Sequence, residues 1–155
     1  MKLTRVVAIP SKLSKQVRES MKSPGYGHPA HREVATGYGP CRHCLRTFRI
    51  GAEERILFTY DPFHGLFPYP LPGPIFIHAE ACERYPETEG FPEDLRDHSM
   101  TFIAYGAERK VLKERRIADG RIEEAVSEML ENSKVRFLHV RDTEAGCYDL
   151  RIERS

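Results

Sequence analysis

The sequence has no excess of charge of one sign. Its 24 lysines and arginines are balanced by 23 aspartates and glutamates, so the 155 residues carry a net charge of +1. A protein that neutralises many phosphates normally presents a clear basic excess on one face. The densest basic run, residues 109–116, is interrupted by Glu114 and is predicted to be a solvated strand edge. A general nucleic-acid-binding role is therefore disfavoured.

Long apolar runs are also missing. No stretch approaches the ~20 apolar residues that span a bilayer. The run from Val6 to Ile9 is shorter than the ~7–15 residues of a signal-peptide core. The sequence therefore predicts a cytoplasmic protein without membrane association. In that compartment the four cysteines are expected to be thiols or metal ligands rather than disulfides.

The fingerprints of several common enzyme classes are lacking as well. The sequence contains no nucleophile elbow and no P-loop, and Gly37-Tyr38-Gly39 lacks the third glycine and the following helix of a dinucleotide-binding motif. Internal repeats and low-complexity tracts are also missing. No complete catalytic set can be assembled from the residues that remain.

What is present indicates an ordinary globular chain. At 155 residues, with 40% hydrophobic and 30% charged residues, it fits a single domain over residues 1–155. Patterns of β-branched and apolar residues predict strands over 3–9, 32–36, 54–60 and 75–78, and a helix over 11–22. The fold class is predicted to be α+β, a mainly antiparallel sheet with helices on one face.

The C-terminal third predicts a β-β-α-β-β unit over residues 101–153. A hairpin pairs 101–105 with 111–117, and strands follow at 135–140 and 148–152, with a short helix at 91–95 ahead of the unit. Asp119 is expected to cap the intervening helix, because apolar residues recur after it at helical spacing. These residues are Ile122, Ala125, Val126, Met129 and Leu130.

Residues 62–74 form a proline-rich segment. Prolines at 62, 68, 70, 72 and 74 alternate with aromatic and aliphatic side chains. Proline at this density excludes both a helix and an interior strand. The aromatic side chains still need apolar neighbours, so the segment is predicted to be a stiff loop covering the core.

The most specific chemical signal is a pair of motifs, Cys41-Arg42-His43-Cys44 and His78-Ala79-Glu80-Ala81-Cys82. Cys41, Cys44, His78 and Cys82 together would complete a tetrahedral Zn²⁺ shell. His78 and Cys82 share a face if residues 78–82 are helical, but lie ~13 Å apart if they are extended. Two alternatives remain: a redox pair of Cys41 and Cys44, and thiols that only pack near the core.

The last two strands offer candidate catalytic residues. If Leu138 and Val140 point inward, the expected register pairs Val140 with Tyr148 and places His139 opposite Asp149. A carboxylate beside an imidazole raises its pKa and orients it as a general base. The alternative is an exposed cross-strand pair without catalytic function.

Two functions from different classes are compatible with these features. The first is a non-catalytic binding or interaction module, stabilised by zinc. The second is a small-molecule enzyme or ligand-binding protein with a pocket near the 62–74 loop, lined by Arg42, His43 and His64. We favour the first, because no catalytic set is complete.

Three stretches resemble an uncharacterised bacterial family, the domain of unknown function numbered 1203. They are Pro40-Cys41-Arg42, the run of residues 73–78, and residues 137–140 together with Gly146-Cys147-Tyr148. The likeness covers most of the chain in order and spacing. It implies a bacterial protein, and the family has no established activity from which catalytic residues could be transferred. In that family Pro-Cys-Arg often lacks a second cysteine three residues on, so Cys44 departs from the family pattern and the resemblance does not imply a metal site.

Overall fold

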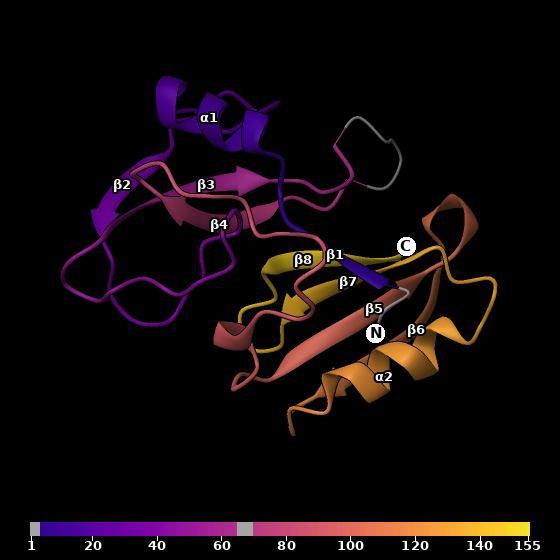
Figure 1. Cartoon of the computed structure of the whole chain (residues 1–155). Helices are drawn as coiled ribbons and strands as arrows, with labels where there is room; N and C mark the ends of the chain where they lie inside the picture. Colours follow the sequence, from indigo (N-terminus) through magenta and orange to yellow (C-terminus); the bar gives the residue numbers. More distant parts are fainter. Residues whose placement is uncertain (1–3, 65–69) are drawn as a thin grey trace. The chain divides into compact units, whose positions relative to one another are not determined.

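A computed structural model describes residues 4–64 and 70–155 of the chain (Figure 1). Its contacts divide the chain into two compact units, residues 8–85 and a second unit made of residues 1–7 and 86–155. In the described ranges, no helix combines the length and the apolar character that crossing a membrane requires.

In the unit of residues 8–85, the described residues form one helix and a three-stranded antiparallel sheet. The helix is α1 (Ser11–Ser20), which buries Ser14 and Val17. The sheet has the order β2-β3-β4. Its strands are β2 (His31–Val34), β3 (Glu54–Tyr60) and β4 (Gly73–His78). Ile56 of β3 pairs with Ile77 of β4, and both side chains are buried.

The second unit is built on a five-stranded antiparallel sheet with the order β1-β8-β7-β5-β6. Its strands are β1 (Thr4–Val7), β5 (Met100–Tyr105), β6 (Val111–Ile117), β7 (Phe137–Asp142) and β8 (Tyr148–Arg154). Two 3-10 turns, η1 (Glu93–Leu95) and η2 (Ala107–Arg109), precede and follow β5. The predicted β-β-α-β-β order of this region is confirmed.

Helix α2 (Ile122–Leu130) lies alongside β6 in this unit (Figure 1). Its buried residues include the predicted Ile122, Ala125, Val126 and Met129, so the amphipathic pattern was read correctly. The predicted cap was wrong. The helix begins three residues after Asp119, whose carboxylate accepts a hydrogen bond from the Arg121 N–H instead. The intervening Gly120 has a φ of +76°, which turns the chain before the helix starts.

The predicted register of β7 and β8 was wrong by two residues. Val140 pairs with Leu150, and His139 pairs with Arg151 rather than with Asp149. The cause is an irregularity between Val140 and Arg141, because Arg141 pairs with Tyr148 and leaves Asp149 as an extra residue in β8. A shift by two preserves which side chains face the core, so Val140 and Leu150 are still buried as predicted.

The α+β class and the antiparallel pairing are confirmed, although the strands form two sheets rather than one. The single domain over residues 1–155 and the placement of helices on one face stay predictions. Part of the predicted proline-rich loop 62–74, namely residues 65–69, lies outside the described residues. The statement that this loop covers the core therefore stays a prediction too.

Candidate metal centre

Cys41 and Cys44 lie on a tight turn. The Leu45 N–H donates to the Cys41 carbonyl at 2.8 Å, and the Cys41 N–H donates to the Arg46 carbonyl at 2.9 Å. A bridge between Pro40 and Thr47 closes the turn. Leu45 has a φ of +58°, a left-handed conformation that reverses the chain directly after Cys44. We refer to residues 40–47 as the knuckle.

The knuckle lies beside the end of β4. Cys41 forms a parallel bridge with Phe76, and the Arg42 N–H donates to the Phe76 carbonyl at 3.0 Å. This pairing brings His78, the last residue of β4, next to Cys41, whose sulfur accepts the His78 N–H at 3.3 Å. Residues 79–80 then form a bend, neither the helix nor the extended chain considered from the sequence, and the bend returns Cys82 to the cluster.

Cys41, Cys44, His78 and Cys82 offer four ligand atoms that all lie within 4.8 Å of one another. The Cys41 and Cys82 sulfurs are 3.8 Å apart, and the Cys44 sulfur is 3.5 Å from His78 Nδ1. Zn–S and Zn–N bonds of ~2.3 and ~2.05 Å at tetrahedral angles imply separations of about 3.8 Å between two sulfurs and about 3.6 Å between sulfur and nitrogen. The two observed pairs have the spacing of a tetrahedral zinc shell.

The other nitrogen of His78 also has a partner. His78 Nε2 is 3.2 Å from the Glu53 carboxylate, whose second oxygen accepts the Arg49 N–H at 2.8 Å. This Arg49 N–H and the charge of His78 hold the pKa of Glu53 below its ordinary value despite burial. The Phe48 ring lies 4.5 Å from the imidazole, centre to centre. A carboxylate on the distal nitrogen is the usual way in which proteins orient a metal-binding histidine.

The Cys82 sulfur is contacted by two further nitrogens. Arg18 Nη2 lies 3.4 Å from the sulfur, and Arg18 Nε donates to the His78 carbonyl at 3.0 Å. His43 Nδ1 lies 3.2 Å from the same sulfur, and His43 Nε2 is 2.9 Å from the Ser11 hydroxyl. Burial lowers the pKa of His43, so its ring is neutral at pH 7. With its proton on Nδ1, His43 supports Cys82 from outside the shell instead of replacing His78 as a ligand.

Residues of the cluster shift one another's pKa values. Burial opposes ionisation of Cys41, yet hydrogen bonds with Cys44, Cys82 and His78 hold the pKa of its thiol well below the ordinary value. Cys41 and Cys82 in turn raise the pKa of the Cys44 thiol, and they raise the pKa of His78 to about 10. The Cys41 thiolate is thus stabilised, while Cys44 and His78 keep their protons. A bound cation would allow all of the ligands to be deprotonated together.

The redox alternative for Cys41 and Cys44 lacks its structural context. All four cysteines of the chain are free thiols. A thioredoxin-like pair lies at the start of a helix, whereas here residues 42–44 form a turn, residues 45–46 have no regular structure and Thr47 forms a bridge. The knuckle therefore fits metal ligation better than disulfide chemistry.

Arg42, His43 and His64 were expected to line a ligand pocket, but Arg42 and His43 are buried and His64 is exposed. Arg42 is buried, and its guanidinium donates to the Pro40 carbonyl at 2.7 Å. His43 is buried against Cys82, as described above. His64 is exposed, and its ring lies 5.7 Å from that of Tyr26. The contacts of Arg42 and His43 are structural contacts of the knuckle, and a pocket near residues 62–74 stays a prediction.

The proposed His139–Asp149 pair is corrected by the structure. The register places Arg151 opposite His139, and both His139 and Asp149 are buried rather than exposed. Burial, helped by the charges of Arg141 and Arg151, lowers the pKa of His139 to about 3. A general base needs the opposite shift, towards the operating pH, so the geometry does not support this role for His139.

The residues around the ligands were not found from the sequence. Arg18 and Ser11 belong to α1 and Glu53 precedes β3, so no fixed spacing links them to the cysteines. The signal available for Glu53 is its position directly before β3, the strand that pairs with β4, where His78 lies. That signal requires the sheet register to be known first.

No curated protein and no solved structure shows significant similarity to the chain. One family model does match, over residues 38–154, and it confirms the resemblance seen in the sequence motifs. The match includes the whole knuckle and all four residues of the cluster. The chain belongs to the family described as Protein of unknown function (DUF1203).

Proposed function

We propose that this protein is a zinc-stabilised, non-catalytic binding module in which Cys41, Cys44, His78 and Cys82 hold one Zn²⁺. The observation that carries the proposal is the convergence of three sulfurs and one imidazole nitrogen within 4.8 Å. Four protein ligands complete the tetrahedral shell, whereas a catalytic zinc keeps one position open for water or substrate. A closed shell therefore supports a structural ion.

The ion would join three segments that are distant in the sequence. These are the knuckle, the end of β4 and the segment after the bend at residues 79–80. Because such a site does not exist in the unfolded chain, binding free energy contributes directly to folding. Reduced thiols are maintained in the cytosol, so we assign the module to the cytoplasm.

Exposed apolar side chains support a binding role for the same unit. Among the described residues, five of the six large hydrophobic side chains that are exposed lie between residues 8 and 85. They are Tyr26, Val34, Tyr38, Ile50 and Leu71. Tyrosine is one of the residue types that contribute most to affinity in protein interfaces, so Tyr26 and Tyr38 are the expected main contacts with a partner.

Elemental analysis of the purified protein tests the proposal. Protein prepared with zinc and without chelators should contain about one Zn²⁺ per chain, and a Cys44→Ser variant should lose it because serine lacks the thiolate that closes the proposed shell. Cobalt substitution should give the absorption bands of a tetrahedral thiolate site. Cys147→Ser is the matched control, since Cys147 lies outside the cluster. Metal-free wild-type protein, or equal zinc loss in both variants, would refute the site.

Replacing Glu53 by glutamine should weaken zinc binding without removing a ligand. The substitution takes a negative charge from His78 Nε2, and loss of such an outer partner typically costs about 10–100-fold in metal affinity. Competition against a chromophoric chelator measures the change. Glu54→Gln is the control, because Glu54 pairs with Arg32 at 2.8 Å and belongs to no metal contact. Unchanged affinity in Glu53→Gln would show that the carboxylate does not orient His78.

A further inference from the structure

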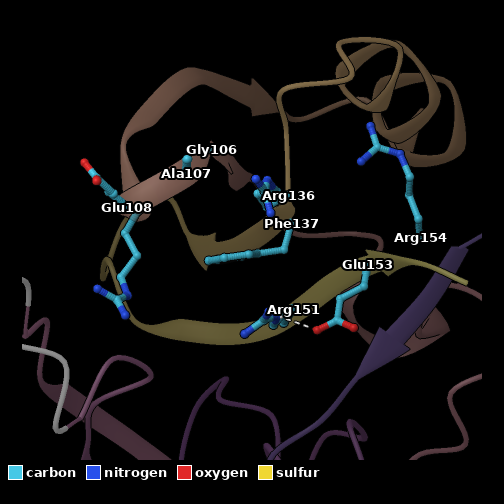
Figure 2. A pocket seen from close by; sticks show the side chains of 9 residues that line it. Gly106, Ala107, Glu108, Arg136, Phe137, Arg151, Glu153 and Arg154 are labelled. Carbon is cyan, nitrogen blue, oxygen red and sulfur yellow. Dashed lines mark ion pairs between the residues drawn. The ribbon is translucent and has the colours of Figure 1, made fainter.

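A shallow, open cavity of about 460 Å³ lies in the unit that carries the five-stranded sheet (Figure 2). Its lining comes from η2, from the residue before β7, from the start of β7 and from β8. Four of its side chains are arginines: Arg109, Arg136, Arg151 and Arg154. The lining belongs to one unit, and none of the candidate zinc ligands is part of it.

The residues that line this cavity carry more positive charge than the chain as a whole. Four arginines face two glutamates, Glu108 and Glu153, which leaves an excess of two positive charges where the whole protein carries +1. Glu153 is moreover already engaged, since its carboxylate is 2.7 Å from Arg151 Nε and 2.6 Å from Arg5 Nη2. A concave site with such an excess attracts anions.

Arg151 and Arg136 are the two arginines best placed to contact a ligand. The Arg151 guanidinium carbon lies 3.9 Å from the centre of the Phe137 ring, which itself stacks on Tyr105 at 5.3 Å, so Arg151 is held in one orientation. Arg136 is exposed, and within residues 4–64 and 70–155 its guanidinium has neither a hydrogen bond nor an ion pair. Arg154, in contrast, donates to the Leu130 and Asn132 carbonyls.

The backbone at the rim of the cavity is strained. Glu108 and Arg109 are consecutive non-glycine residues that both have a φ of +56°. Each left-handed residue of this kind costs on the order of 1 kcal/mol or more, and such residues concentrate at ligand sites. Despite this cost, Glu108 and Arg109 of η2 are held at the lining of the cavity.

We propose that this cavity binds a phosphate group, either free or carried by a small organic molecule, through Arg136 and Arg151. Guanidinium groups bind phosphate oxygens in a bidentate manner, and Arg151 is already oriented for such a contact. The volume lies within the ~300–1,000 Å³ range of small-molecule sites and exceeds what a phosphate ion alone would fill. Arg109 and Arg154 add positive charge around the group. The site is independent of the proposed zinc centre.

Isothermal titration of the full-length protein at low ionic strength tests this assignment with three probes: inorganic phosphate, glycerol 3-phosphate and succinate. Arg136→Ala should weaken phosphate binding at least about tenfold, since one lost charged contact contributes about 1.4 kcal/mol or more. Arg151→Lys, which keeps the charge but removes the planar fork, should weaken it as well. Tighter binding of glycerol 3-phosphate identifies an organic phosphate, and equal or tighter binding of inorganic phosphate identifies the free ion.

Arg121→Ala is the matched control, because Arg121 is an exposed arginine of the same unit that does not line the cavity. Its phosphate affinity should stay within about twofold of wild type at constant salt. Three results would overturn the proposal: no heat of binding with either phosphate probe up to about 10 mM, equal losses in Arg136→Ala and Arg121→Ala, or succinate binding as tight as phosphate binding. Circular dichroism verifies that each variant is folded.

Discussion

Stripping zinc from the protein with a chelator at neutral pH is expected to unfold the knuckle and lower the melting temperature by at least about 10 °C. Structural zinc sites bind with apparent free energies of about 10–16 kcal/mol, comparable to the whole stability of a small domain. Even 2 kcal/mol of that total would shift the melting temperature of a unit this size by about 8–16 °C. The effect should be large because the proposed ion would join three separate segments of the chain.

Hydrogen exchange followed by mass spectrometry locates the effect. Amides of residues 39–48 and 75–82 should lose protection when zinc is removed, and they should recover it when zinc is added back. Helix α2 carries no ligand and lies in the other unit, so its amides are the internal reference. Unaltered exchange in the knuckle after complete loss of zinc would contradict a structural role for the ion.

The four candidate ligands were recoverable from the sequence because metal ligation restricts residue type and spacing. Two cysteines separated by two residues need only a turn to bring their sulfurs together. The approach of His78 and Cys82 was not predictable in the same way. It depends on the parallel bridge between Cys41 and Phe76 and on the bend at residues 79–80, which are tertiary features without a local signature.

The elements of the second unit were predictable for a related reason. Side chains alternate or recur with the period of the strand or helix that buries them, so α2 and its buried face followed from the apolar spacing. The register of β7 and β8 did not follow, because one extra residue at Asp149 changes the pairing without changing which residues are apolar. The period of the apolar residues predicts which face of a strand is buried, but it does not predict where a bulge occurs.

The corrected environment of His139 leads to a second large effect, on the pH dependence of stability. The side chain is buried between the rings of Tyr105, Phe137 and Tyr148, at centre distances of 4.9–5.1 Å. Burial, together with Arg141 and Arg151, lowers its pKa from 6.5 to about 3. The unfolded chain therefore binds a proton at His139 below about pH 6.5, whereas the folded chain does not until about pH 3.

Between these two values the unfolded state binds more protons, so stability must fall as the pH falls, by about 1.4 kcal/mol per pH unit. From pH 7.5 to pH 5.0 the contribution of His139 is a loss of about 2 kcal/mol. His139→Leu should lack this loss, since leucine fills the same apolar site and does not titrate. Hydrogen exchange of β7 and β8 amides at both pH values measures the free energy of opening of this unit.

The comparison must separate His139 from other acid-sensitive groups, above all the four proposed zinc ligands, from which protons would displace the metal at low pH. Wild type and His139→Leu share every one of those groups, so the difference between their pH dependences isolates His139 whatever the absolute stability of the variant. His28→Leu, the same substitution at an exposed histidine, should retain the wild-type slope. His139→Leu could instead lose stability on acidification as steeply as wild type does. In that case the protonation of His139 does not cause the acid destabilisation of this unit.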